Sequence, residues 1–158
     1  MPLTIISEAF LPDGMIPVRY TCDAQNVSPP LSWSELPEGT QSLALIVDDP
    51  DAPDPAAPQR IWVHWVLYNI PVATKYLAEG LSVNDLPPGT LQGLNDWQRT
   101  GYSGPCPPIG IHRYFHKIFA LDLLLPDLKN PTKTMLEHAM EGHVLGHAAL
   151  IGLYQRRH

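Results

Sequence analysis

Proline occupies 18 of the 158 positions of this chain, about twice the usual share. The prolines are scattered between short apolar runs and do not form a single tract. Scattered prolines are typical of the loops that separate short strands, because proline fixes φ and removes a backbone donor. The pattern therefore predicts a mainly β fold and argues against a disordered chain.

Size and charge limit what this fold can do. With 158 residues, 44% of them hydrophobic, residues 1–158 suit a single globular domain with its own core. The formal charge of −6 argues against nucleic acid or an anionic membrane as the main partner, because both require a basic face. The first residues lack a basic signal-peptide start, and no apolar run approaches the roughly 20 residues of a membrane span. We therefore expect a cytoplasmic protein without a membrane span.

Three runs have the composition of strands: residues 42–47, 61–69 and 114–122. The first run is followed by aspartates and prolines, which predicts a strand that ends at a rigid, acidic loop. A period of two places four side chains of the second run on one face: Trp62, His64, Val66 and Tyr68. Both faces of that run are largely apolar, so we expect a central strand that is covered on both sides.

The C-terminal region contains the one convincing helix signal. Thr134 and Glu137 fit a capping box, which predicts a helix that starts there and ends near Gly146. Residues 148–154 then predict a closing strand. Strands dominate the whole pattern, which indicates a two-sheet antiparallel β-sandwich with a minor helix.

The two cysteines leave two alternatives open. Cys22 and Cys106 lie far apart and lack the spacing of a zinc or dithiol redox motif. The simplest interpretation is two reduced thiols. The alternative is a disulfide, if the fold brings the two residues together.

Residues 104–114, Gly-Pro-Cys-Pro-Pro-Ile-Gly-Ile-His-Arg-Tyr, form the most distinctive stretch of the chain. Three prolines and two glycines predict a stiff loop that holds one shape at little entropic cost. The loop leads into an imidazole, a cation and a phenol at His112, Arg113 and Tyr114. This combination predicts the lip of a pocket for a small anion.

A second polar cluster precedes this loop in the sequence. Asp49 and Asp51 flank a proline, and paired carboxylates can serve acid–base chemistry or metal binding. From this loop alone, a solvated turn is the better interpretation. His64 lies within an apolar run, where, taken singly, a core histidine is a better interpretation than a site residue. His143 and His147 have i, i+4 spacing but lack the glutamate of a HExxH zinc motif.

The order of these motifs resembles the phosphatidylethanolamine-binding proteins, also called Raf-kinase-inhibitor-like proteins, and in particular their bacterial branch. The resemblance rests on ten segments: Tyr20-Thr21-Cys22-Asp23, Ser28-Pro29-Pro30-Leu31-Ser32-Trp33, Asp49-Pro50-Asp51-Ala52-Pro53, Trp62-Val63-His64-Trp65, Asn95-Asp96, Gly101-Tyr102, Gly104-Pro105-Cys106-Pro107-Pro108, His112-Arg113-Tyr114, Glu141-Gly142-His143-Val144-Leu145 and Gly152-Leu153-Tyr154-Gln155-Arg156. It implies an antiparallel Greek-key β-sandwich with one or two short helices near the C-terminus. It also implies a small anion-binding pocket that usually performs no catalysis.

Carried over residue by residue, the resemblance implies a ligand-binding set of Asp49, Asp51, Trp62, His64, Pro108, His112 and Tyr114. A carboxylate near His64 or His112 should raise the pKa of the imidazole, so that a charged ring donates to phosphate. Asp49 is expected to orient this ring, since a bare carboxylate repels phosphate. Trp62 and Pro108 are expected to form apolar walls. A cis peptide is expected before Pro50 or Pro53.

The sequence thus favours a non-enzymatic protein, without metal or cofactor, that binds phosphate or a phosphorylated small molecule. We further expect that the protein modulates a partner such as a kinase or another enzyme, and that it forms a homodimer. The alternative is a metal-dependent phosphoesterase-type hydrolase that uses the Asp/His cluster. A third alternative is an interaction scaffold whose pocket is vestigial.

Overall fold

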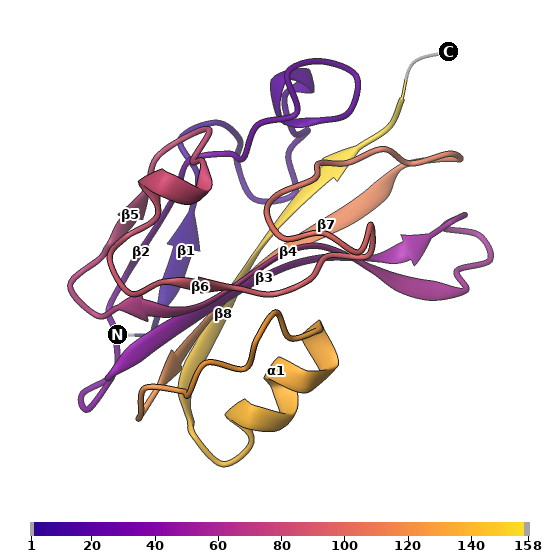
Figure 1. Ribbon diagram of the computed structural model, residues 1–158. Coiled ribbons are helices and arrows are strands. Elements are labelled where there is room, and N and C mark those ends of the chain that lie inside the picture. The colour runs from indigo at the N-terminus through magenta and orange to yellow at the C-terminus, as the bar shows by residue number, and fades with distance from the viewer. Residues whose placement is uncertain (1, 157–158) are drawn as a thin grey trace.

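The computed structural model describes residues 2–156 as two antiparallel sheets and one α-helix (Figure 1). The larger sheet has the strand order β6-β4-β3-β7-β8, and the smaller has the order β1-β2-β5. The strands are β1 (Thr4–Ile6), β2 (Leu31–Ser34), β3 (Ser42–Ala52), β4 (Arg60–Pro71), β5 (Tyr76–Leu77), β6 (Leu91–Gln92), β7 (His112–Leu121) and β8 (Val144–Tyr154). The helix is α1 (Lys133–Met140), and two 3-10 turns cover Val18–Tyr20 and Val83–Asp85. The predicted mainly β fold, with a helix near the C-terminus, is confirmed.

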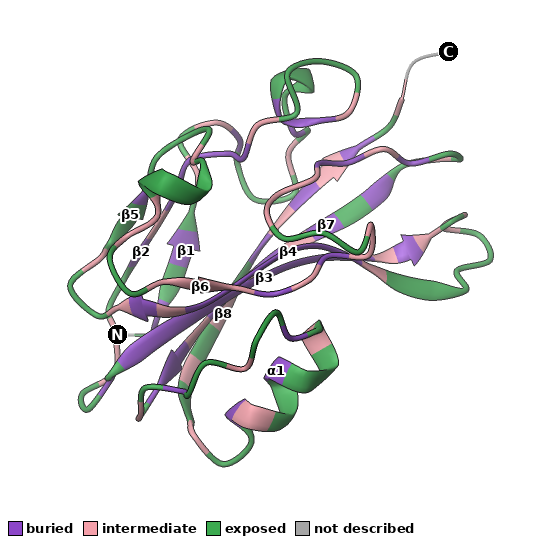
Figure 2. Cartoon of the chain, viewed as in Figure 1, coloured by how far each residue is buried: buried purple, intermediate pink, exposed green. Residues whose placement is uncertain are grey.

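Two apolar cores lie on opposite faces of the larger sheet. One fills the space between the two sheets, where Leu43, Leu45 and Val47 of β3 meet Ile5 of β1 and Trp33 of β2. The other lies under α1 and includes Ala44 and Ile46 of β3 with Leu136 and Met140 of the helix. Figure 2 shows β3 buried along most of its length. The middle strand is therefore β3. Strand β4 lies between β3 and β6 and is buried from Val63 to Tyr68, with side chains in both cores, which agrees with the predicted strand covered on both sides.

Strand β3 runs five residues past the end predicted for it, which corrects the placement of the acidic pair. Asp49 and Asp51 belong to the strand rather than to a loop. Pairing of β3 with β7 ends at Asp48, opposite Phe115, and the pairing with β4 is irregular between Asp49 and Ala52. Proline is tolerated at such an edge or bulge because no ladder hydrogen bond is required there. The proline between the two aspartates therefore does not end the strand.

A bulge in β4 changes the expected alternation of side chains. Val47 pairs with Trp65 while Asp48 pairs with Val63, so the register passes over His64. Such an insertion re-aims neighbouring side chains. The prediction that Trp62, His64, Val66 and Tyr68 share one face is wrong: Trp62 and His64 line a cavity, whereas Val66 and Tyr68 join the core under α1. In β7 a regular period of two is kept, with Tyr114, Ile118 and Ala120 in the core between the sheets.

The helix begins and ends earlier than the sequence predicts. Its N-cap is Thr132, whose hydroxyl accepts the Met135 N–H at 3.2 Å, so the capping box expected at Thr134 is wrong. The helix ends at Met140, and Gly142 with φ 78° turns the chain into β8, which starts at Val144. Among residues 2–156 no helix is long and apolar enough to cross a membrane.

A disulfide joins Cys22 to Cys106, with their Cα atoms 5.4 Å apart. The simplest interpretation from the sequence, two reduced thiols, is therefore wrong, because the fold brings together two loops that are 84 residues apart. The Cys22 N–H also donates to the Pro105 carbonyl at 3.1 Å, and the Tyr102 hydroxyl donates to the Tyr20 carbonyl at 2.7 Å. Disulfides are rare in the reducing cytosol outside hyperthermophiles, and the cytoplasmic location stays a prediction.

Candidate functional site

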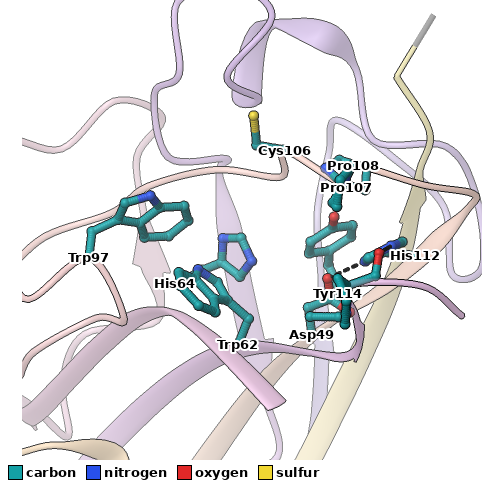
Figure 3. A pocket seen from close by; sticks show the side chains of 11 residues that line it. Asp49, Trp62, His64, Trp97, Cys106, Pro107, Pro108, His112 and Tyr114 are labelled. Atoms are coloured by element: carbon teal, nitrogen blue, oxygen red, sulfur yellow. Dashed lines mark hydrogen bonds and ion pairs between the residues drawn. The ribbon is translucent and has the colours of Figure 1, made fainter. Parts of the chain in front are cut away.

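A cavity of about 320 Å³ opens where β3, β4 and β7 meet the proline-rich loop (Figure 3). Its lining includes six of the seven residues predicted from the sequence: Asp49, Trp62, His64, Pro108, His112 and Tyr114. Five further residues complete the lining: Ala52, Pro53, Trp97, Cys106 and Pro107. The fold thus brings two distant polar segments to one hollow, while their role in ligand binding stays a prediction.

The seventh predicted residue, Asp51, has its carboxylate engaged outside this lining. It accepts the Arg113 backbone N–H at 2.8 Å and the Arg113 guanidinium at 3.0 and 2.9 Å. The hydrogen bond from Arg113 lowers the pKa of Asp51, so this carboxylate stays ionised and neutralised by its partner. These contacts favour a supporting role for Asp51, in which it holds β3 against the start of β7.

Asp49 and His112 form a buried pair at the cavity wall. Oδ2 of Asp49 lies 2.5 Å from Nδ1 of His112, and Oδ1 of Asp49 accepts the Asp51 N–H at 2.7 Å. Nε2 of His112 faces the Ile109 carbonyl at 2.8 Å and the Pro53 carbonyl at 3.2 Å. Burial raises the pKa of Asp49, and the hydrogen bond with His112 opposes that effect. Both nitrogens of His112 are therefore used within the protein, so the expectation that this ring donates to phosphate is wrong. The orienting role of Asp49 stays a prediction.

His64 differs from His112 in its surroundings. Its Nδ1 lies 2.6 Å from the Ser103 carbonyl, which can only accept, so Nδ1 carries a proton. Burial lowers the pKa of His64 to about 4. The expectation that a carboxylate raises the pKa of this ring is wrong, because burial of the imidazole outweighs the distant carboxylates. At neutral pH the ring is neutral and Nε2 is a hydrogen-bond acceptor.

The hydroxyl of Tyr114 is buried and has no hydrogen-bond partner among residues 2–156. The Tyr114 ring is 1% exposed and lies 5.2 Å from the His64 ring, in an edge contact. Burial raises the pKa of Tyr114, and the nearby Asp49 carboxylate raises it further, so the hydroxyl keeps its proton. An unpaired buried polar group costs about 1–3 kcal/mol, which a ligand that accepts this hydrogen bond would recover.

Trp97 lines the cavity and was not predicted from the sequence. Its ring makes edge contacts with Trp62 at 5.4 Å and with His64 at 5.2 Å, and Figure 3 shows His64 between Trp97 and Tyr114. Trp97 lies in a turn at residues 95–98, and the Asn95 side chain stabilises this turn by accepting the Trp97 N–H at 2.9 Å. The signal that could have found Trp97 is an Asn-Asp turn directly before an aromatic residue.

The remaining wall consists of conformationally restricted backbone. The Ala52–Pro53 peptide is cis, as expected for one of the two prolines considered. Gly104 packs so tightly that a Cβ would lie 2.1 Å from the Tyr20 carbonyl oxygen, and its N–H donates to the Asn26 side chain at 2.7 Å. The loop at residues 104–108 is thus fixed to the segment at residues 20–26 by the close packing of Gly104 and by the disulfide.

Comparisons with known proteins agree with this architecture. A family model described as phosphatidylethanolamine-binding protein matches residues 6–155. A UPF0098 protein of Methanothermobacter thermautotrophicus is 50% identical over 155 residues, which cover 98% of this chain and 99% of the relative. The crystal structure of a phosphatidylethanolamine-binding protein homologue from Chlamydia trachomatis has a TM-score of 0.90 at 39% identity and covers 99% of both chains. Escherichia coli YbcL has a TM-score of 0.89 at 28% identity, covering 99% of this chain and 100% of its own.

Proposed function

Because the chain belongs to the phosphatidylethanolamine-binding protein family, we propose that its cavity binds a small oxyanion, phosphate or a phosphorylated small molecule, without catalysing a reaction on it. The observation that carries this proposal is the Tyr114 hydroxyl, a buried donor without a partner in the described chain at a cavity wall. Native proteins rarely leave such a group unpaired. A phosphate oxygen is an acceptor that suits it.

The charges around the cavity are compatible with an anion, although the protein as a whole is acidic. Nε2 of His112 faces two carbonyl oxygens, which only accept, and Nδ1 contacts the Asp49 carboxylate. With one proton on Nε2 and one in the Nδ1–Asp49 contact, the pair has no net charge. The Asp51 carboxylate is paired with the Arg113 guanidinium. Neither carboxylate therefore presents an uncompensated negative charge to a ligand.

The cavity has the size and walls of a small-molecule site. A volume of about 320 Å³ lies at the lower end of the range of ligand pockets. Apolar surfaces of Trp62, Trp97 and Pro108 surround the few polar groups, which restricts water and strengthens hydrogen bonds to a ligand. This arrangement favours a compact group such as phosphate or a short phosphate ester.

We favour binding over the metal-dependent hydrolase considered from the sequence. Such an enzyme needs several clustered metal ligands, and residues 2–156 contain no group of three or more His, Cys, Asp or Glu side chains that could hold a metal ion. The modulation of a kinase or another enzyme and the formation of a homodimer stay predictions.

Isothermal titration calorimetry with inorganic phosphate and with O-phosphoethanolamine tests the proposal. We expect saturable binding to the wild-type protein and a roughly tenfold or greater loss of affinity in Tyr114→Phe, which removes only the hydroxyl. Tyr76→Phe, at an exposed position on β5, is the matched control and should bind like wild type. Absence of binding at millimolar concentrations, or unchanged affinity in Tyr114→Phe, would contradict the proposal and favour a vestigial pocket.

A further inference from the structure

We propose that the cavity selects oxyanions that carry an acidic proton, namely inorganic phosphate and singly charged phosphate monoesters, over oxyanions that carry none, namely sulfate and phosphate diesters. This inference rests on the proposed function and specifies its ligand class. It follows from what the two groups beside each other in the cavity, His64 and Tyr114, offer a ligand.

The tautomer of His64 is fixed by backbone. Nδ1 of the ring donates to the Ser103 carbonyl at 2.6 Å, and the Ser103 N–H donates back to the His64 carbonyl at 3.2 Å. Ser103 immediately precedes Gly104, which is itself held by the Asn26 side chain. Because this reciprocal pair leaves no freedom to exchange donor and acceptor, Nε2 is the nitrogen without a proton. Within residues 2–156 it has no hydrogen-bond partner, so it is left for the cavity that the ring lines.

The surroundings of His64 keep the ring neutral. The titratable groups nearest to it are Asp48 and Asp49 on β3, His112, Tyr114 and His116 on β7, and Asp96 in the loop after β6. Each of the three carboxylates already has a cationic or proton-sharing partner: Lys117 and Lys133 for Asp48, His112 for Asp49, and Arg60 for Asp96. His116 is buried, and its Nδ1 faces the Tyr114 and Leu150 carbonyls. Among residues 2–156, no uncompensated carboxylate is therefore available to charge the His64 ring.

The cavity consequently offers one donor and one acceptor on two rings that contact each other. The Tyr114 hydroxyl donates, His64 Nε2 accepts, and the two rings are 5.2 Å apart. A phosphate with one P–O–H group satisfies both at once, since an unprotonated oxygen accepts from Tyr114 and the P–O–H donates to His64. Sulfate and a phosphate diester lack the acidic proton, so an anionic oxygen would face the Nε2 lone pair. Sites built around a hydrogen bond reject analogues that cannot make it.

The first test compares inorganic phosphate with sulfate at pH 7 and constant ionic strength by calorimetry. Wild type should bind phosphate at least roughly tenfold more tightly than sulfate. In His64→Gln, whose amide can present either a donor or an acceptor, this ratio should fall towards one. His147→Gln, at an exposed position on β8, is the matched control and should keep the wild-type ratio.

The second test needs no variant and separates a free ester from a lipid headgroup. O-phosphoethanolamine is a monoester whose second pKa is about 6, so its singly protonated form, and with it the apparent affinity, should fall roughly 50-fold between pH 6 and pH 8. Glycerophosphoethanolamine, a diester, should bind weakly at both values, and inorganic phosphate should change much less. Equal affinity for phosphate and sulfate, or for monoester and diester, would overturn the selectivity while leaving anion binding intact. Failure of every oxyanion to bind would instead reject the proposed function.

Discussion

Nδ1 of His112 lies 2.5 Å from Oδ2 of Asp49, and the two side chains are only 1% and 4% exposed. The contact joins β7 to β3 at the wall of the cavity, and Nε2 of the same ring is held by the Ile109 carbonyl. A buried pair of this kind fixes the geometry of the site, because neither partner has another way to satisfy its polar atoms. It also assigns the ring of His112 to positioning, whereas His64 and Tyr114 keep groups free for a ligand.

Asp49→Ala should lower the free energy of unfolding by about 1–3 kcal/mol, because the buried His112 Nδ1 would lose its partner. Asp49→Asn should cost less, since the amide can still form a hydrogen bond with the ring. Urea denaturation measures both values, and Glu38→Ala at an exposed position is the control. Equal, negligible effects of the two Asp49 variants would show that the pair does not hold the site.

The stability of the protein should fall as the pH is lowered from about 6.5 towards 4. Burial lowers the pKa values of His64 and His116 to about 4 each, whereas the unfolded chain takes up protons near pH 6.5. The unfolded state therefore binds more protons in this window, and each histidine should contribute up to about 3 kcal/mol that is present above pH 6.5 and lost at pH 4. Urea denaturation across this range tests the sign. A free energy of unfolding that does not change over this pH range would mean that folding does not lower the pKa values of these two histidines.

Reduction of the Cys22–Cys106 disulfide should lower the free energy of unfolding by about 2–5 kcal/mol, because the bond closes a long segment of the unfolded chain. It should also weaken phosphate binding, since Cys106 lines the cavity. Denaturation with and without a dithiol reductant measures the first effect. The Cys22→Ser, Cys106→Ser double variant is the control and should not respond to the reductant. An identical midpoint for oxidised and reduced wild type would refute this prediction.

Asp48 should matter for stability and not for the ligand. Its buried carboxylate accepts Lys117 and Lys133, each at 2.9 Å, and so ties α1 to β3 and β7. Asp48→Asn should destabilise the fold by roughly 2–3 kcal/mol, less than for a fully buried pair because Lys117 can reach solvent. Phosphate affinity of the folded variant should stay within about twofold of wild type. A large loss of affinity without loss of stability would mean that Asp48 acts on the cavity.

The sequence was most informative where a pattern is local. The β composition, the strand at β7 and the stiff loop at residues 104–108 all depend on neighbouring residues, and they were predicted correctly. The resemblance in motif order named seven candidate site residues, and six of them line the cavity. Trp97 lay in an aperiodic stretch, where no periodicity marks a side chain as facing a cavity.

Features that depend on distant partners could not be predicted in the same way. The bulge at His64 exists because β3 and β4 pair out of register there, and the sequence of β4 alone does not contain that information. The continuation of β3 through Asp49 and Asp51 likewise requires β4 and Arg113 as partners. The neutral state of His64 follows from its burial and from the Ser103 carbonyl, both of which are properties of the folded chain.

The most direct test of the central claim, that the cavity binds phosphate between Tyr114 and His64, is the ¹⁵N NMR signal of the His64 ring during a phosphate titration. We predict that the Nε2 resonance, assigned through the His64→Gln variant, shifts in a saturable manner as a P–O–H group donates to it, while an equal concentration of sulfate leaves it nearly unchanged. A His64 Nε2 signal that does not move at saturating phosphate, or that moves equally with sulfate, would contradict this account of the site.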